Sequence, residues 1–273
     1  MCCELWVIQP ATHNSIHITS VKITHMKSPQ SFKGIIYRVF NSGSQDKVVY
    51  LIQEDGTKLS CIAKSVKKAG SRKAHALEIG NLVTLKALPG NLASITEMSV
   101  LNEFTAWKQD FKSMALLQLL CEVMDDFCYE ENKDEQLYEI LYNTLAFGAE
   151  KQLFAVSVFL IKILDHTGVL PELDRSLVTE EDLNSDNIYN IPGEVGYVSD
   201  VTVKENNYYS NSEKIDPRIY KTQRFILATD QKSALRIKLT GEEESKLFIL
   251  HLNWLENLMS VKIKSREILN TIL

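Results

Sequence analysis

The spacing of apolar residues changes near residue 100, and this change constrains the fold more than any other feature of the sequence. Before it, apolar residues alternate or form short runs, as strands require. After it, they recur at steps of three and four residues, as the buried face of a helix requires. The sequence therefore predicts an α+β protein in which a β-barrel domain, residues 1–100, precedes a helical domain, residues 101–273.

The N-terminal part holds five or six short predicted strands. The main candidates are residues 35–40, 48–52, 58–63, 81–88 and 93–97. Alternating residues in 16–23 add a further candidate, and Asp55-Gly56 is a typical hairpin turn between two of the strands. So few strands avoid open edges most economically by closing into a small barrel. Residues 1–15 are interpreted as an extension outside this barrel.

Three helices are predicted in the first part of the helical domain. The apolar face of the first runs to Phe127 and begins with Phe104, Trp107, Phe111 and Met114. Asp134 can cap the second helix. The third, about residues 150–167, is apolar nearly all round, which places it at the centre of a helical bundle.

The remainder of the helical domain is predicted to be less regular. Gly168 is a typical stop for the third helix, and the polar residues 172–215 are interpreted as an irregular insertion. Further helices follow, and their signals are the N-cap pair Asp216-Pro217, the capping box of Thr240 and Glu243, and the short basic segment 260–269.

Residues 58–73 form a basic block, with six lysines and arginines and no acidic residue, although the formal net charge of the chain is −5. Cations at a strand end and in the loop after it suit a polyanion backbone, because each neutralised phosphate releases counterions. A solvated charged loop is the alternative. The DNA-contact residues that we expect are Lys64, Lys67, Lys68, Arg72 and Lys73, with Lys33 and Arg38 on the sheet face.

Aromatic side chains beside these cations could stack on unpaired bases. Tyr37, Phe40 and Tyr50 lie on predicted strands, and strict alternation puts Tyr37 on the opposite face from Arg38 and Phe40. One set must then be core and the other exposed. A second, weaker platform is a further hypothesis, with Tyr208, Tyr209 and Tyr220 near Lys221 and Arg224.

The sequence disfavours several classes of protein. No apolar run reaches the roughly 18 residues of a membrane span, and the N-terminus is a poor signal peptide. Five cysteines without regular spacing fit reduced thiols in a cytoplasm better than a disulfide framework. Because the chain has neither a Walker-type phosphate loop nor a nucleophile elbow, we expect no enzymatic activity.

Two groups of residues have the chemistry of metal ligands. His13 and His17 follow Cys2 and Cys3, and we interpret them as scattered polar residues. The second group is an acidic cluster between two predicted helices, which we interpret as a solvated loop. Its members are Asp125, Asp126, Glu130, Glu131, Asp134 and Glu135. We therefore expect no metal site.

Four short motifs follow one another in a fixed order across about 200 residues. The first is IAKSVKKAGSRK, from Ile62 to Lys73, and the second joins Leu82-Val-Thr-Leu with Ile95-Thr-Glu. The third is FLIKILDHTGVLPEL at 159–173, and the fourth is the basic tail 261–269. Together they resemble the motifs of the bacterial RecO family of recombination mediators.

The resemblance implies an N-terminal OB-fold barrel and a helical C-terminal domain. It also implies binding of single- and double-stranded DNA, annealing of complementary strands without ATP, and recombinase loading at gaps. The implied partners are RecR and the acidic, apolar tail of the single-strand-binding protein. The rim of a groove for that tail could come from Lys221, Arg224, Lys262, Lys264 or Arg266. The alternative is an unrelated OB-fold adaptor that binds RNA or a protein.

The sequence departs from the family at one site. Many members carry a four-cysteine zinc site after a Pro-x-Leu motif, and the first ligand pair would fall here at Ser176 and Thr179. No cysteine follows Cys128. Because a structural zinc site needs four thiolate or imidazole ligands, we expect this chain to bind no zinc there.

Overall fold

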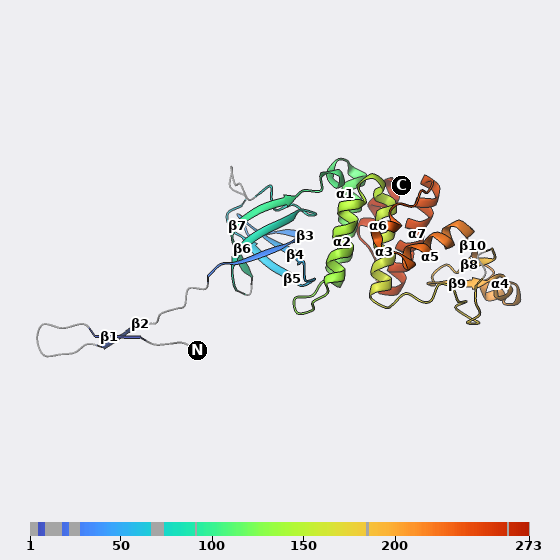
Figure 1. Cartoon of the computed structure of the whole chain (residues 1–273), viewed down its shortest axis with the longest axis horizontal. Helices are drawn as coiled ribbons and strands as arrows, with labels where there is room; N and C mark the ends of the chain where they lie inside the picture. Colours follow the sequence, from blue (N-terminus) through green and yellow to red (C-terminus); the bar gives the residue numbers. More distant parts are fainter. Residues whose placement is uncertain are drawn as a thin grey trace, which may run out of the picture.

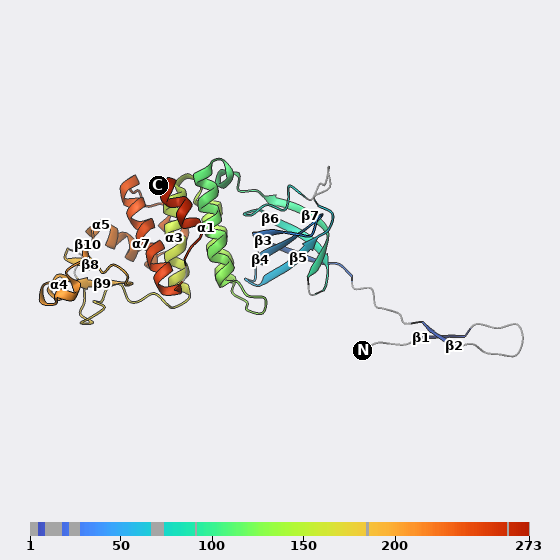
Figure 2. The same ribbon diagram turned by 180° about the vertical axis from the view of Figure 1, so that it is seen from behind.

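The computed structural model describes residues 28–66, 74–90, 92–183, 186–260 and 262–272, together with the backbone of β1 (Leu5–Ile8) and β2 (Ile18–Val21). The arrangement is elongated, with a β-barrel, a group of helices and a small sheet following one another (Figure 1). Helix α1 lies next to the barrel, and the small sheet lies at the far end of the helices, as the reverse view also shows (Figure 2).

Five strands close into an OB-type barrel, as predicted. They are β3 (Gln30–Ser42), β4 (Asp46–Gln53), β5 (Lys58–Ala63), β6 (Leu82–Leu88) and β7 (Ala93–Asn102). Their order is β3-β4-β5-β7-β6, with β3 also paired to β6, and only β5 and β7 run parallel. The interior is filled by alternate side chains such as Ile36, Val49, Leu51, Cys61, Val83 and Leu85.

The alternating residues near position 18 belong to a separate pair of strands. Strand β2 pairs antiparallel with β1, with Ile18 opposite Ile8, and these two strands form their own two-stranded sheet. The barrel itself begins with Gln30. The count of five or six predicted barrel strands therefore resolves to five.

The helical domain is built around a buried central helix, as predicted. Its main helices are α1 (Phe111–Phe127), α2 (Glu135–Phe147), α3 (Gln152–His166), α5 (Pro217–Ala228), α6 (Gln231–Ala234), α7 (Gly241–Met259) and α8 (Ser265–Ile272). Helix α3 is buried on nearly every side, and Gly168 ends it with a φ of 70°. Its apolar composition is thus explained by its central position.

The predicted capping residues begin the helices as expected. Asp134 accepts a hydrogen bond from the Leu137 amide at the start of α2, and Asp216 accepts one from the Arg218 amide at the start of α5. Thr240 and Glu243 form the reciprocal capping box of α7. Each contact satisfies an amide that the first turn of a helix leaves unpaired.

One part of the predicted apolar face was wrong. Phe111 and Met114 are 65% and 53% exposed, whereas Trp107 is fully buried. The reason is that the helix is interrupted: Trp107 lies in a short 3-10 turn, Thr105–Lys108, and α1 begins afresh after its N-cap Asp110. The break changes the rotation of the helix, so the two side chains face outward.

The segment 172–215 contains more regular structure than its composition indicates. Strands β8 (Ile188–Asn190), β9 (Tyr197–Ser199) and β10 (Glu213–Lys214) form a small antiparallel sheet in the order β10-β8-β9. A short helix, α4 (Asp200–Glu205), follows β9, and turns make up most of the remainder.

A chain of buried hydrogen bonds attaches this sheet to the helices. The Tyr197 hydroxyl donates to Gln223 Oε1, and Gln223 Nε2 donates to His251 Nε2 at 2.9 Å. His251 Nδ1 in turn donates to the Ser157 carbonyl at 2.8 Å. Complete burial lowers the pKa of His251 to about 4, so the imidazole is neutral and can accept as well as donate.

The last helix is joined to the first. Glu122 on α1 accepts hydrogen bonds from the amides of Lys264 and Ser265, at 2.7 and 3.1 Å, where α8 begins. Arg266 in the first turn of α8 is ion-paired with Glu256 of α7. The C-terminal helix is therefore fixed to two sides of the bundle.

Candidate nucleic-acid interface

A β-bulge in β3 decides which side chains share the outer face of the barrel. The register with β4 shifts between Ile36 and Arg38, which leaves Tyr37 as the extra residue. The rings of Tyr37 and Tyr50 are 6.3 Å apart, and the Arg38 guanidinium lies 5.6 Å from the Tyr50 ring. The prediction that Tyr37 and Arg38 face opposite ways was wrong, because the bulge interrupts the alternation of the strand.

Two cations and two aromatic rings meet on this face. The Phe40 and Tyr50 rings pack edge to face at 5.6 Å, Lys58 Nζ lies 4.4 Å from the Tyr50 ring, and Arg38 lies 5.8 Å from Phe40. Phe40 is 40% exposed, so part of its ring is open to a ligand. We call Arg38, Phe40, Tyr50 and Lys58 the barrel platform. Stacking surfaces with adjacent cations are the elements that single-stranded nucleic acid binding needs.

Tyr37 belongs to the core, whereas Arg38 and Phe40 are exposed, so the expected division into a core set and an exposed set is confirmed. Its side chain is 2% exposed and packs with the apolar residues of the helical domain. Burial, followed by the neighbouring Cys128 and Asp125, raises its pKa well above the usual tyrosine value. The hydroxyl has no hydrogen-bond partner within the described parts of the chain. Tyr37 therefore anchors the barrel to the helices and is not available for stacking.

Acidic side chains of the helical domain reach the platform. Arg38 is ion-paired with Asp125 near the end of α1, and Glu130 Oε1 accepts a hydrogen bond from Ser60 Oγ at 2.7 Å. Ser60 is the direct partner of Tyr50 in the β4–β5 ladder. The interpretation of the acidic cluster as a solvated loop holds for Asp126, Glu131 and Glu135, which are exposed. It was incomplete for Asp125 and Glu130, because these two contact the barrel.

Main-chain contacts fix the loop that follows α1 against the β4–β5 hairpin. The Asp134 amide donates to the Asp55 carbonyl, and the Lys58 amide donates to the Tyr129 carbonyl, both at 3.0 Å. The Asp134 carboxylate also bonds His166 Nε2, at 2.7 Å for its closer oxygen. Gly56, with a φ of 79°, lets the hairpin approach so closely that a Cβ there would lie 1.9 Å from the Asp134 carbonyl oxygen.

The other predicted DNA-contact residues are distributed over two regions. Lys33 lies on β3 and pairs with Glu54 at 2.5 Å, so its charge is already balanced. Lys64 is exposed just after β5. The remaining four, Lys67, Lys68, Arg72 and Lys73, lie outside the described residues. The structure thus brings Arg38 and Lys58 together and leaves Lys33 on a neighbouring part of the sheet.

The predicted second platform does not form as expected. Tyr220 is 1% exposed and packs against Tyr197 in the core, so it cannot stack on a ligand. Tyr208 is exposed and touches Tyr209 edge to face at 5.0 Å. Arg224, one turn from Tyr220, pairs with Asp174 at 3.5 Å. Tyrosine spacing alone could not distinguish the buried member from the exposed ones.

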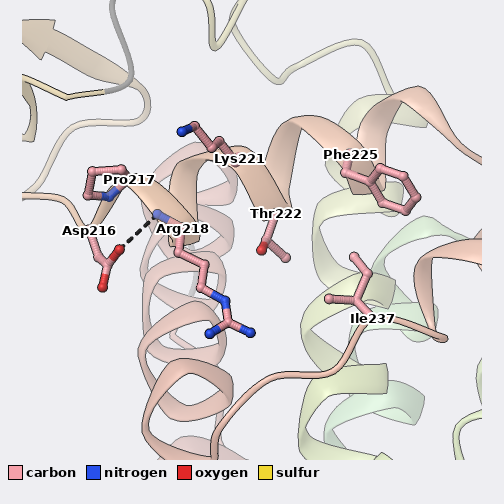
Figure 3. Close-up of a pocket in the computed structure, with 7 residues that line it drawn as sticks. All are labelled: Asp216, Pro217, Arg218, Lys221, Thr222, Phe225 and Ile237. Carbon is pink, nitrogen blue, oxygen red and sulfur yellow. Dashed lines mark hydrogen bonds between the residues drawn. The ribbon is translucent and has the colours of Figure 1, made fainter.

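The cations proposed for a partner groove are in different environments. Arg266 is held by Glu256 and Asn253, whereas Lys262 and Lys264 are exposed at the start of α8. Lys221 lies on α5 at an open groove between α5 and the loop before α7 (Figure 3). The lining of this α5 groove consists of Asp216, Pro217, Arg218, Lys221, Thr222, Phe225 and Ile237.

The α5 groove combines an apolar floor with a basic rim. Thr222 and Phe225 lie on the side of α5 that faces Ile237 (Figure 3), and Phe225 is partly exposed. Arg218 at the rim pairs with Glu243 at 3.0 Å. Sequence reasoning found Lys221 but missed Phe225. Its position three residues after Thr222, on the side of α5 that faces Ile237, was the available signal.

Neither a metal site nor a membrane helix emerges from the described residues. Within them, no three His, Cys, Asp or Glu side chains are grouped as ligands of a metal ion would be. In the same part of the chain, no single helix is both long and apolar enough to cross a membrane. The bent pair Glu135–Phe147 and Ala149–His166 reaches that length and composition only when taken together.

Comparisons with known proteins place the chain in one family. Residues 26–104 match the family described as "Recombination protein O N terminal", and residues 108–267 match "Recombination protein O C terminal". The chain is 26% identical over 248 residues to a DNA repair protein RecO of Clostridium perfringens, which covers 88% of this chain and 96% of that protein. It is 25% identical over 144 residues to one from Symbiobacterium thermophilum, or 51% and 57% of the two chains. The chain therefore belongs to the RecO family of DNA repair proteins.

Proposed function

We propose that this protein is a recombination mediator that binds single- and double-stranded DNA in the cytoplasm and anneals complementary strands. With RecR, it would help to load the recombinase at gaps. The barrel platform is the observation that carries this proposal, because Phe40 and Tyr50 lie beside Arg38 and Lys58 on an OB-type barrel, and such rings suit the stacking of exposed bases. No covalent chemistry is needed for these steps, so the protein would act without catalysis of its own.

The basic block would extend the platform along the nucleic acid. Lys58 belongs to both, and Lys64 is exposed a few residues further on. Lys67, Lys68, Arg72 and Lys73 would then supply phosphate contacts from the loop after β5. We expect these contacts to set the salt dependence of binding, and the aromatic rings to set the part of the affinity that salt does not change.

DNA binding can be tested by titrating labelled oligothymidine at about 50 and 200 mM salt. Replacing Lys67, Lys68, Arg72 and Lys73 by alanine should flatten the salt slope by roughly 0.7 for each lost contact. Phe40→Ala should lower affinity by about 1–3 kcal/mol and leave the slope unchanged. Phe111→Ala is the matched control, since Phe111 is also exposed but lies on α1. Unchanged affinity in folded forms of both barrel variants would refute this placement of the site.

We further propose that the α5 groove binds the C-terminal tail of the single-strand-binding protein. Apolar side chains at the end of such a tail would contact Phe225 and Ile237, and its carboxylates would pair with Lys221 at the rim. This contact would bring the protein to coated single strands, where effective concentration strengthens weak DNA contacts.

A fluorescence titration with the tail peptide tests this contact. Reversing the charge by Lys221→Glu should weaken binding about thirtyfold, because it turns an attraction of about 1 kcal/mol in water into a repulsion of similar size, a change of about 2 kcal/mol. Lys204→Glu is the control, since Lys204 is an exposed lysine of α4. Equal affinities for the two variants would place the peptide elsewhere.

A further inference from the structure

The charges at the barrel platform cancel. Arg38 and Lys58 contribute two positive charges. The helical domain brings two negative charges to the same place, Asp125 on Arg38 and Glu130 on Ser60, beside Tyr50. The platform therefore offers aromatic surface without a net positive potential of its own. An interface that relied on charge alone would not be built with Arg38 already paired to Asp125.

Only one carboxylate oxygen of Asp125 is hydrogen-bonded among the described residues. Its Oδ2 bonds the guanidinium, but its Oδ1 is buried and has no hydrogen-bond partner among the described residues. The observed effect of Asp125 at the platform is to neutralise the Arg38 guanidinium.

The two acids cannot easily leave the platform. Tyr129, next to Glu130, accepts a main-chain hydrogen bond from Lys58, and Asp134 donates one to Asp55. Asp125 lies in the last turn of α1, directly before this loop. The acids are thus parts of a fixed junction, and any DNA that reaches the platform meets them there.

Single strands and duplexes respond differently to such a surface. An unpaired base can stack on Phe40 or Tyr50, and stacking needs no net charge. A duplex keeps its base faces covered and presents phosphates, with one charge for about every 1.7 Å of its axis. We propose that Asp125 makes the barrel platform selective for unpaired bases, because it removes the electrostatic attraction on which a duplex depends and leaves the stacking surface intact. This inference rests on the proposed DNA-binding function.

The test compares oligothymidine with a short duplex, each titrated against wild type and Asp125→Asn at one low salt concentration. One unit charge near a phosphate changes affinity about fivefold in water. We therefore expect Asp125→Asn to bind the duplex about fivefold more tightly and oligothymidine less than twofold more tightly. Asp174→Asn is the matched control, because it removes the same charge from an ion pair with Arg224 in the helical domain.

Two results of these titrations would contradict the proposed role of Asp125. An equal gain for both DNAs, or no gain for the duplex, would overturn the selectivity of Asp125. If circular dichroism showed that Asp125→Asn does not fold, Glu130→Gln should produce the same preferential gain, since Glu130 is exposed and bonded only to Ser60 among the described residues. Failure of every form to bind either DNA would instead refute the proposed function, and the inference with it.

Discussion

Replacing Gly56 by alanine should destabilise the protein more than its position in a surface hairpin would indicate. The residue has a φ of 79°, where any other L-residue loses about 1–2 kcal/mol. The new Cβ would also lie 1.9 Å from the Asp134 carbonyl oxygen, so hairpin and loop must separate. Separation removes the Asp134–Asp55 and Lys58–Tyr129 hydrogen bonds, each worth about 1 kcal/mol. We expect a total loss of about 3–4 kcal/mol.

Urea denaturation, followed by tryptophan fluorescence, measures this loss as a shift of the midpoint at constant slope. Gly43→Ala is the matched control. Gly43 has a φ of 63° in the β3–β4 turn, but apart from its chain neighbours no atom of the described residues lies within 4 Å of the position that a Cβ would take, so only the backbone strain applies there. The difference between the free energies of unfolding lost in the two variants measures the contact between the β4–β5 hairpin and the loop after α1. Equal losses for Gly56→Ala and Gly43→Ala would refute the argument.

Two further predictions concern pH and metal. Because burial lowers the pKa of His251 from 6.5 to about 4, the unfolded chain binds the extra proton first as pH falls. The contribution of His251 to the free energy of unfolding should therefore be fully present above pH 6.5 and should decrease by about 3 kcal/mol towards pH 4. Urea denaturation of His251→Gln should show that this part of the pH dependence is lost. Since no cysteine follows Cys128, elemental analysis should find no stoichiometric zinc, and a chelator should leave Tm unchanged; one zinc per chain would contradict this.

The sequence was informative wherever local chemistry determines structure. Asp134, Asp216 and Thr240 begin helices because their side chains accept hydrogen bonds from nearby amides, and such contacts depend on a few neighbouring residues. The apolar helix α3 could be placed at the centre because no polar face was left for solvent. The break at Asp110 was missed, since the apolar spacing continues across it while the helix does not.

The candidate interface was predictable only in part. Its cations and aromatic residues could be named from strand patterns, but the bulge at Tyr37 depends on the pairing of β3 with β4. Arg38 and Asp125 are 87 residues apart, and no local pattern indicates that they meet. Charge counted along the sequence therefore could not show that Arg38 is balanced by an acid from the helical part of the chain.

The contact between α1 and α8 has a consequence for how the chain is made. Glu122 caps the start of α8 through Lys264, which follows it by 142 residues. At a synthesis rate of about 5–20 residues per second, the end of α1 remains without this partner for roughly 7–30 s on the ribosome. During that time the surface that α8 will cover is open to chaperones and to other nascent chains. Helix α8 is made long after α1 and thus completes the bundle beside it.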